Sequence, residues 1–157
     1  ALRYEKDHPE QSKVLISESF SDNTQDPWQK QFEKLIRWIR ATLLQYYRPL
    51  ETKLIAIEDF VFTGRRRKAG FACSKIVGAL YADLRRNGPN CVTVFGPGEW
   101  RKGLTQAFTA DSERQWLASL DTILRRQSTP ETDHANDAYQ MALFLVWKLH
   151  KGEVSVL

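Results

Sequence analysis

Three side chains in two separate segments have the right chemistry to hold a divalent metal ion. Glu58 ends a short apolar run, and His134 and Asp137 stand near the start of a long apolar segment. Residues three apart in a helix lie on one face, so His134 and Asp137 are expected to point to the same side. Carboxylates from separate elements suit Mg²⁺, which takes oxygen ligands, and a pair of such ions supports phosphodiester hydrolysis.

Each of these residues also has a purely structural interpretation. Glu58 follows a buried strand, where open α/β sheets bind ligands, but a carboxylate there can equally cap the strand or pair with an arginine. Thr132 is a good helix N-cap, and an acidic first-turn residue such as Asp133 gains about 0.3–1 kcal/mol from the helix dipole. Capping accounts less well for Asp137, which lies one turn further in. Both interpretations therefore stay open.

Other kinds of site are poorly supported by the sequence. Neither Cys73 nor Cys91 has a neighbouring His or Cys, so zinc is a poor fit and the two thiols indicate reduced, structural cysteines in a reducing compartment. The segment GPGEWRKG lacks the Gly-Lys-Ser/Thr ending of a phosphate loop, and no Gly-x-Ser-x-Gly motif occurs. A nucleotide triphosphatase or a serine hydrolase is therefore not indicated.

The charge of the chain favours a polyanionic partner. The net charge is +4 with a pI near 9.1, and the cations cluster in four runs: GRRRK (64–68), LRR (84–86), WRK (100–102) and LRR (124–126). Clustered cations release counterions when they bind phosphates, although a merely solvated basic surface is the alternative. The 157 residues fit one domain over 1–157, and no apolar run reaches the roughly 18 residues of a membrane span.

The apolar periodicity predicts alternating strands and helices. We expect a hairpin of residues 1–6 and 13–20, strands over 54–57 and 91–95, and helices over 69–86, 100–108, 111–126 and 133–150. Asp26 is expected to cap a further helix that has Pro27 in its first position and covers a sheet. This order predicts an α/β protein with a mixed sheet and helices on both faces.

The segments IAIEDFVF, KIVGALYADLRRNG, VTVFGPGEWRKGL, SERQWLASL and HANDAYQMALFL resemble, in order and spacing, RuvC-type Holliday-junction resolvases of the RNase H-like superfamily. The resemblance implies an RNase H-like sheet and a Mg²⁺-dependent nuclease, with Mn²⁺ as a substitute, that acts as a homodimer on four-way DNA junctions. It also implies a cytoplasmic location in a bacterial or phage-infected cell, with an organelle as the alternative, and no membrane partner.

The resemblance assigns roles to individual residues. Glu58 matches the strand glutamate of the family, Asp137 its final carboxylate, and His134 a position that is Asp or His in the family; Asp133 falls one residue before the motif. The implied DNA contacts are Arg65, Arg66, Arg67, Lys68, Lys75, Arg101, Lys102 and Arg114. The aromatic residues Phe60, Phe62 and Phe71 could stack on an unpaired base, for about 1–3 kcal/mol per base, or belong to the core.

Two features of the resemblance concern whole elements. The apolar stripe Ile76, Val77, Leu80 and Leu84 fits a dimer interface, as the resemblance favours, or packing on the sheet. The first strand of the family carries an Asp, and here that strand is missing, as though about a dozen residues preceded Ala1. Asp7 replaces this aspartate poorly because it lies in the hairpin turn. If the chain as it stands is the whole molecule, we expect it to bind metal weakly and to cleave little or nothing; if residues precede Ala1, we expect the longer protein to be an active enzyme.

The sequence thus predicts a structure-selective endonuclease, a crossover junction endodeoxyribonuclease. One alternative is a catalytically impaired module that binds branched DNA. The other is a relaxed nuclease that cuts flaps, forks or RNA-containing duplexes.

Overall fold

The computed structural model describes residues 2–15, 20, 25–44, 54–59, 67–87, 91–130 and 132–154. The chain forms two compact units. The terminal unit consists of Ala1–Ser19 and Gly98–Ser155, and the central unit of Phe20–Pro97 and Val156–Leu157. Each unit is described by itself below, and the single domain over residues 1–157 stays a prediction.

The terminal unit begins with the predicted hairpin, which is shorter than expected. Strands β1 (Leu2–Arg3) and β2 (Lys13–Val14) pair antiparallel around a 3₁₀ turn, η1 (Pro9–Gln11). The ladder stops early because the buried Ser12 hydroxyl, not a backbone carbonyl, accepts the Glu5 N–H at 3.1 Å. The strand predicted over residues 1–6 therefore ends at Arg3. Strand β2, predicted over residues 13–20, ends at Val14, opposite Leu2, and residues 16–19 lie outside the described part of the chain.

A side chain from a distant turn extends this small hairpin. The amide oxygen of Gln127 accepts the Val14 N–H at 3.1 Å, and its amide nitrogen donates to the Ser12 carbonyl at 2.9 Å. The Gln127 amide thus bonds to β2 as a peptide group of a neighbouring strand would. Gln127 follows helix α4 (Asp111–Arg125), so this contact fixes the hairpin to the end of that helix.

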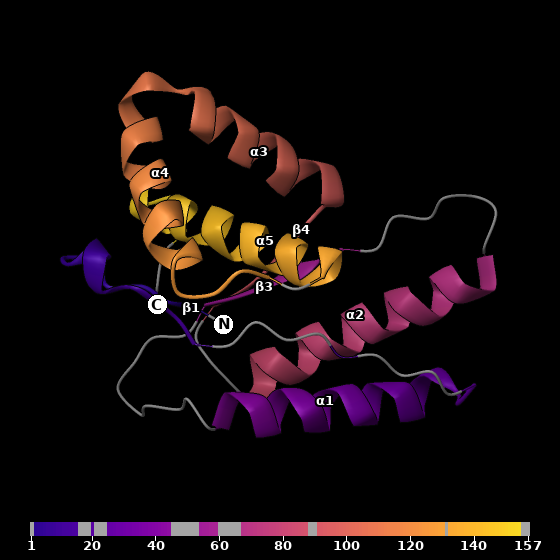
Figure 1. Cartoon of the computed structure of the whole chain (residues 1–157). Helices are drawn as coiled ribbons and strands as arrows, with labels where there is room; N and C mark the ends of the chain where they lie inside the picture. Colours follow the sequence, from indigo (N-terminus) through magenta and orange to yellow (C-terminus); the bar gives the residue numbers. More distant parts are fainter. Residues whose placement is uncertain are drawn as a thin grey trace. The chain divides into compact units, whose positions relative to one another are not determined.

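Three helices make up the rest of the terminal unit: α3 (Pro97–Thr109), α4 (Asp111–Arg125) and α5 (Asp133–His150). Helix α3 starts three residues before the predicted Trp100, because Pro97 suits a first helical position. Side chains at helical spacing form the core, namely Trp100, Leu104, Ala107, Leu117, Leu120, Leu124, Leu143 and Phe144. Helix α5 packs against both α3 and α4 (Figure 1).

Polar contacts define both ends of α5. The Thr132 hydroxyl accepts the Ala135 N–H at 3.1 Å, which confirms the predicted N-cap. At the other end Gly152 adopts a φ of 70°, and its N–H donates to the Leu149 carbonyl at 3.0 Å. The left-handed conformation favours glycine, so this residue stops the helix.

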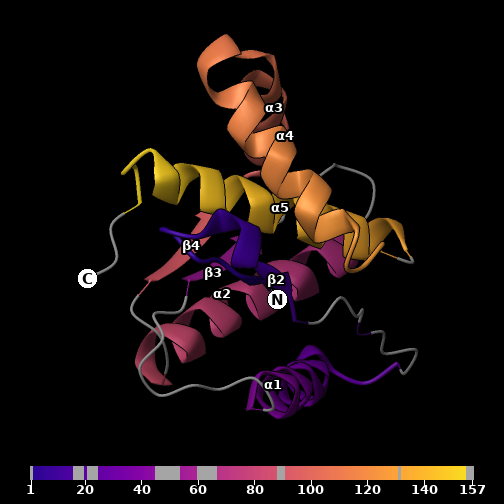
Figure 2. The same cartoon turned by 60° about the vertical axis from the view of Figure 1, so that its left-hand side comes forward.

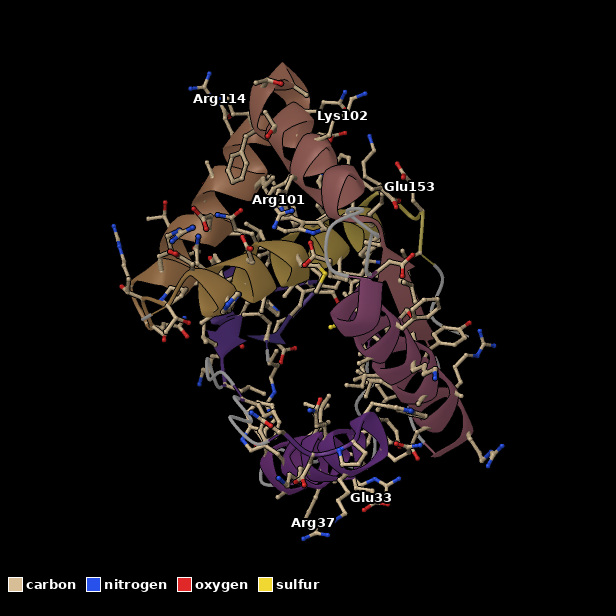
Figure 3. The ribbon with its side chains drawn as sticks, turned by 90° about the vertical axis from the view of Figure 1, so that its right-hand side faces the viewer. Glu33, Arg37, Arg101, Lys102, Arg114 and Glu153 are labelled. Carbon is tan, nitrogen blue, oxygen red and sulfur yellow. The ribbon has the colours of Figure 1, made fainter. Side chains whose placement is uncertain are left out.

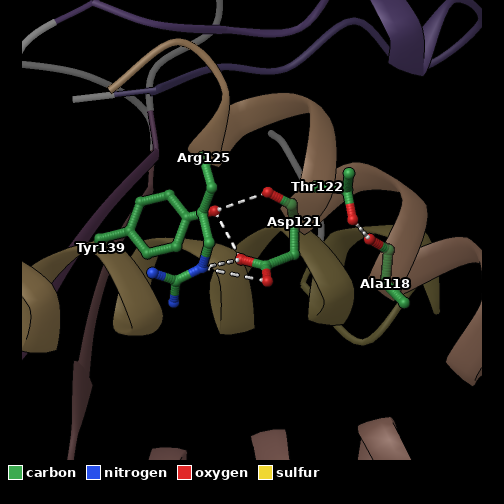
Figure 4. A network of polar contacts seen from close by, with 5 residues as sticks. All are labelled: Ala118, Asp121, Thr122, Arg125 and Tyr139. Carbon is green, nitrogen blue, oxygen red and sulfur yellow. Dashed lines mark hydrogen bonds and ion pairs between the residues drawn. The ribbon is translucent and has the colours of Figure 1, made fainter. Parts of the chain in front are cut away.

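A buried hydroxyl group ties α5 to α4 (Figure 4). Tyr139 donates to the Asp121 carboxylate at 2.7 Å, and Arg125 binds the same carboxylate through Nε at 3.0 and 3.1 Å. Burial and the neighbouring Asp121 carboxylate both raise the pKa of Tyr139. The phenol therefore stays a hydrogen-bond donor, and α5 is held in one rotational position on α4.

The central unit contains a parallel strand pair covered by a helix. Strands β3 (Leu54–Glu58) and β4 (Cys91–Phe95) pair parallel in the register Leu54↔Cys91 to Glu58↔Phe95. Helix α2 (Arg67–Asn87) packs on them through a core of Ile57, Leu84 and Val92. Val77 and Leu80 join this core, so the apolar stripe of α2 lies on the sheet, the second of its two predicted interpretations.

Helix α1 (Trp28–Leu44) is the other helix of the central unit (Figure 2). The helix begins at Trp28, one residue after the predicted Pro27, and the N–H groups of Lys30 and Gln31 donate to the Pro27 carbonyl. The carboxylate of Asp26 binds Lys34 at 2.8 Å, and its predicted role as the cap stays a prediction. The main packing partner of α1 is α2, not a sheet. Arg40 of α1 binds Asp83 of α2 at 2.9 and 3.0 Å.

The described chain is thus a helix-rich α/β structure, as the sequence predicts. The described strands form two separate pairs, one antiparallel and one parallel, and not the single mixed sheet that the sequence predicts. The covering of both sheet faces by helices stays a prediction. In the part of the chain that the structure describes, no helix is long and apolar enough to cross a bilayer.

Candidate functional site

Glu58 is the last residue of β3. Ile57, its neighbour, is buried under α2, and side chains alternate along a strand, so Glu58 lies on the strand face away from α2. Pairing with β4 continues for one more residue, since the Asp59 N–H donates to the Phe95 carbonyl at 2.8 Å. Glu58 is partly exposed and Asp59 is exposed. A carboxylate therefore stands at the carboxyl end of a parallel strand, as predicted.

His134 and Asp137 lie in the first two turns of α5, as the spacing predicts. His134 is exposed and Asp137 is partly exposed. The carboxylate of Asp137 is engaged already: its Oδ2 accepts a hydrogen bond from Nη2 of Arg101 on α3, at 2.9 Å. The terminal unit thus brings together a residue predicted to bind metal and a residue predicted to bind DNA.

The guanidinium of Arg101 has a second support. It lies over the indole ring of Trp100, with Cζ 4.3 Å from the ring centroid. Trp100 is only 1% exposed, so its ring is a fixed platform in the core. A cation over an aromatic face gains about 0.5–1 kcal/mol at exposed sites. The platform and the carboxylate together hold Arg101 beside α5.

The close approach of α3 to α5 sets this geometry. A Cβ atom on Gly103 would lie 2.5 Å from Cε2 of Phe144, far inside van der Waals contact. Phe144 is seven residues beyond Asp137, two turns along the same face of α5. Gly103 therefore permits the helix spacing at which Arg101 reaches Asp137.

The other predicted DNA contacts fall into three groups. Arg65 and Arg66 lie outside the described residues, and Arg67 and Lys68 begin α2 with side chains that are also outside them. Lys75 is exposed, with its ammonium 5.6 Å from the ring centroid of Trp28. Lys102 and Arg114 are exposed, and Figure 3 shows both pointing away from the ribbon of the terminal unit.

Two further predictions concern apolar and thiol side chains. Phe71 is 58% exposed and so does not belong to the core, which leaves base stacking as its open interpretation. Phe60 and Phe62 lie outside the described residues. Cys73 is free and exposed, so the prediction of a structural role for this thiol is wrong, because it lies on the outer side of α2.

The side chains of Asp137, His134 and Glu58 carry the types of ligand atom that a divalent cation binds. Asp137 offers a half-exposed carboxylate that already accepts a cationic partner at 2.9 Å, and His134 adds a nitrogen ligand on the same helix. Glu58 offers a second carboxylate in the central unit. Across the described residues no three His, Cys, Asp or Glu side chains gather closely enough to hold a metal ion. The two donors of α5 therefore form only part of a ligand set.

Comparison with known proteins decides the fold. No family model and no curated protein sequence matches the chain. A solved structure of T. thermophilus RuvC in complex with a Holliday junction substrate matches with a TM-score of 0.63 over 93% of this chain and 85% of that chain, at 22% identity. The chain has the fold of RuvC. The predicted resemblance is thereby confirmed at the level of the fold.

The structure also shows a contact that the sequence did not predict. The Arg101 to Asp137 ion pair joins residues 36 positions apart on two helices. Helical periodicity places each residue on a face of its own helix but does not say which helices meet. The one available signal was the glycine at position 103, since a glycine inside a helix often marks a close approach.

Proposed function

We propose that the protein is a structure-selective endonuclease that resolves four-way DNA junctions by metal-dependent phosphodiester hydrolysis, acting as a homodimer. The observation that carries this proposal is the RuvC fold, found over 93% of the chain in a match to a RuvC bound to a Holliday junction. A fold hosts many functions, so the residues of the site must carry the chemistry.

The proposed metal ligands are Glu58, His134 and Asp137, with Mg²⁺ as the ion and Mn²⁺ as a substitute. Bound divalent cations supply an activated water and stabilise the leaving oxygen of an in-line displacement. The role of the carboxylates is to fix the ligand geometry. His134 is proposed to act as a ligand or as a proton-handling group.

The proposed DNA contacts come from both units. Arg65, Arg66, Arg67 and Lys68 precede or begin α2, Lys75 follows on that helix, and Arg101, Lys102 and Arg114 belong to α3 and α4. Cations of this kind bind the phosphate backbone without reading sequence. The exposed ring of Phe71 is available to stack on an unpaired base, which suits a substrate with an open centre.

The proposal is tested by Mg²⁺-dependent nicking of a synthetic four-way junction. We expect Glu58→Gln to cut the junction at least about a hundredfold more slowly than the unsubstituted protein, because the substitution keeps the size of the side chain but removes a charged ligand. Lys30→Gln is the control, since Lys30 is an exposed residue of α1 outside the proposed site.

Each other outcome has a definite meaning. Equal cleavage by the unsubstituted protein and by Glu58→Gln would contradict the proposed site. Junction binding that survives chelation, without cleavage, would favour the branched-DNA binding module. Equal cleavage of forks, flaps and four-way junctions at one concentration would favour the relaxed nuclease.

A further inference from the structure

Lys75 and Trp28 form a contact between the two helices of the central unit. The ammonium nitrogen of Lys75 on α2 lies 5.6 Å from the centroid of the Trp28 ring on α1, and a ring face attracts a cation within about 6 Å. Lys75 is exposed and Trp28 is partly exposed. Among the described residues no carboxylate pairs with Lys75. Its ammonium group therefore lies on a neutral ring and is accessible to an anion.

The packing of α1 on α2 keeps the Trp28 ring in this position. Figure 1 and Figure 2 both show the two helices side by side. Trp28 begins α1, and Arg40, about three turns further along, binds Asp83 of α2 at 2.9 and 3.0 Å. The ion pair and the contact between cation and ring thus attach α1 to α2 at two separate points.

We propose that Trp28 is a positioning residue for DNA binding, whose indole ring holds the ammonium group of Lys75 in place for a phosphate of the junction. The inference rests on the proposed function, in which Lys75 is a phosphate contact. It adds a residue of another helix that carries no charge itself.

The physical reason is the conformational freedom of lysine. The long side chain loses rotational freedom when its ammonium group binds a phosphate, and this loss opposes binding. A ring that restricts the ammonium group before DNA binds reduces this cost. An ammonium group has three N–H donors, so it can face the ring and still donate to a phosphate oxygen. Trp28 thereby raises the affinity for DNA without adding a positive charge.

The neighbours of Lys75 agree with a surface that faces DNA. Phe71 comes four residues before Lys75, so the two side chains are neighbours on α2, and Phe71 is 58% exposed. In the terminal unit Arg101, another proposed phosphate contact, lies over the ring of Trp100 at 4.3 Å. A tryptophan ring next to a proposed phosphate contact therefore occurs in both units.

The first experiment measures the affinity for a labelled four-way junction by fluorescence anisotropy in the presence of a chelator. Leu and Phe both fill less space than the indole of Trp28, but only Phe keeps a ring face for the ammonium group. We expect Trp28→Leu to bind the junction about two- to fivefold more weakly than the unsubstituted protein, the size of a contact between a cation and a ring at an exposed site. We expect Trp28→Phe to keep most of the affinity.

Trp38 provides the matched control within α1. It is partly buried, as Trp28 is, and its ring packs on Phe20 with the ring centroids 5.6 Å apart. Among the described side chains no cation lies over the Trp38 ring. We expect Trp38→Leu to leave the junction affinity unchanged. An equal loss of affinity in Trp38→Leu and Trp28→Leu would mean that the general packing of α1 sets the affinity, and the role of Trp28 would be overturned.

The second experiment combines Trp28→Leu with Lys75→Gln. If the ring acts through the ammonium group, Trp28→Leu should cause no further loss of affinity once Lys75 is replaced. The dependence of the affinity on salt is a separate measurement. We expect Lys75→Gln to reduce the magnitude of the log–log slope by about 0.9, and Trp28→Leu to leave it unchanged, because the phosphate contact is weakened but still made.

The outcomes separate this inference from the proposed function. If Lys75→Gln changes neither the junction affinity nor the slope, Lys75 does not bind a DNA phosphate, and that part of the proposed function fails together with the inference. If Lys75→Gln lowers both but Trp28→Leu weakens binding equally with Lys75 present and with Lys75 replaced, the phosphate contact stands and the role of Trp28 is overturned.

Discussion

Glu113 illustrates how a single residue stabilises the terminal unit. Its carboxylate on α4 accepts hydrogen bonds from Lys151 and, at 2.7 Å, from the indole N–H of Trp147. The hydrogen bond from Lys151 and then that from Trp147 lower the pKa of Glu113, and the carboxylate in turn raises the pKa of Lys151. The pair fastens the end of α5 to α4.

The signs of these shifts predict a pH dependence. A carboxyl group with a lowered pKa stabilises the fold above its unfolded value of about 4.3, and this contribution disappears as the pH falls through the lower folded value. A raised lysine pKa contributes below about 10.4 and is lost as the pH rises through the folded value. The Glu113 and Lys151 pair is therefore fully effective between about pH 5 and pH 10.

We expect Glu113→Gln to lower the thermal unfolding midpoint at pH 7 and the difference from the unsubstituted protein to shrink below about pH 4. Circular dichroism at both pH values measures this. Glu33→Gln is the control, because Glu33 is an exposed carboxylate on α1 (Figure 3). A difference that stays constant from pH 3 to pH 7 would contradict the assignment.

At the residue scale the sequence predicted the placement of residues within a helix better than their contacts. The types and spacing of His134 and Asp137 placed both in the first turns of one helix, and the structure has them there. The partner of Asp137 was not predictable, because Arg101 belongs to another helix and carried a separate interpretation as a phosphate contact. Pair interactions across helices depend on packing, which no local pattern contains.

At the scale of elements, periodicity predicted most boundaries. Strand β4 has the predicted ends, α5 spans the predicted residues, and α2 begins two residues earlier than expected. The predicted hairpin is the clearest failure, and its cause is a polar side chain that replaces a backbone partner. The Ser12 hydroxyl accepts the Glu5 N–H in place of a backbone carbonyl, which ends β1 early. Such a substitution of side chain for backbone leaves no periodic signal.

The contact between α3 and α5 gives a prediction about these two elements. A methyl group on Gly103 would lie 2.5 and 2.8 Å from the ring of Phe144, which is 1% exposed and so has little room to move. We expect Gly103→Ala to destabilise the fold by about 1–3 kcal/mol, the usual cost of overpacking a core. Denaturant unfolding followed by circular dichroism measures this.

A second glycine of the same helix serves as the control. Gly98 has no atom within 4 Å of an added Cβ, so Gly98→Ala is expected to be neutral or to stabilise α3 by up to about 1 kcal/mol. Equal unfolding free energies for Gly103→Ala and Gly98→Ala would mean that the helices do not approach as closely as Gly103 indicates.

At the scale of the whole molecule, we expect the positive charge of the chain to contribute to its affinity for DNA. The net charge is +4, and eight cationic residues are proposed phosphate contacts. If about six phosphates are neutralised, the logarithm of the junction affinity should fall with the logarithm of the salt concentration with a slope of about −5. Fluorescence anisotropy with a labelled four-way junction in the presence of a chelator measures this slope without cleavage.

Single substitutions then show which cations contribute to the slope. We expect Lys102→Gln and Arg114→Gln each to reduce its magnitude by about 0.9, because each removes about one phosphate contact. Arg37→Gln, which removes an exposed cation of α1 that is not a proposed contact, should leave it unchanged (Figure 3). A slope near zero for the unsubstituted protein would count against both the nuclease and the binding module. Equal reductions by all three variants would mean that the salt dependence arises from the net charge of the protein and not from a defined phosphate-binding surface.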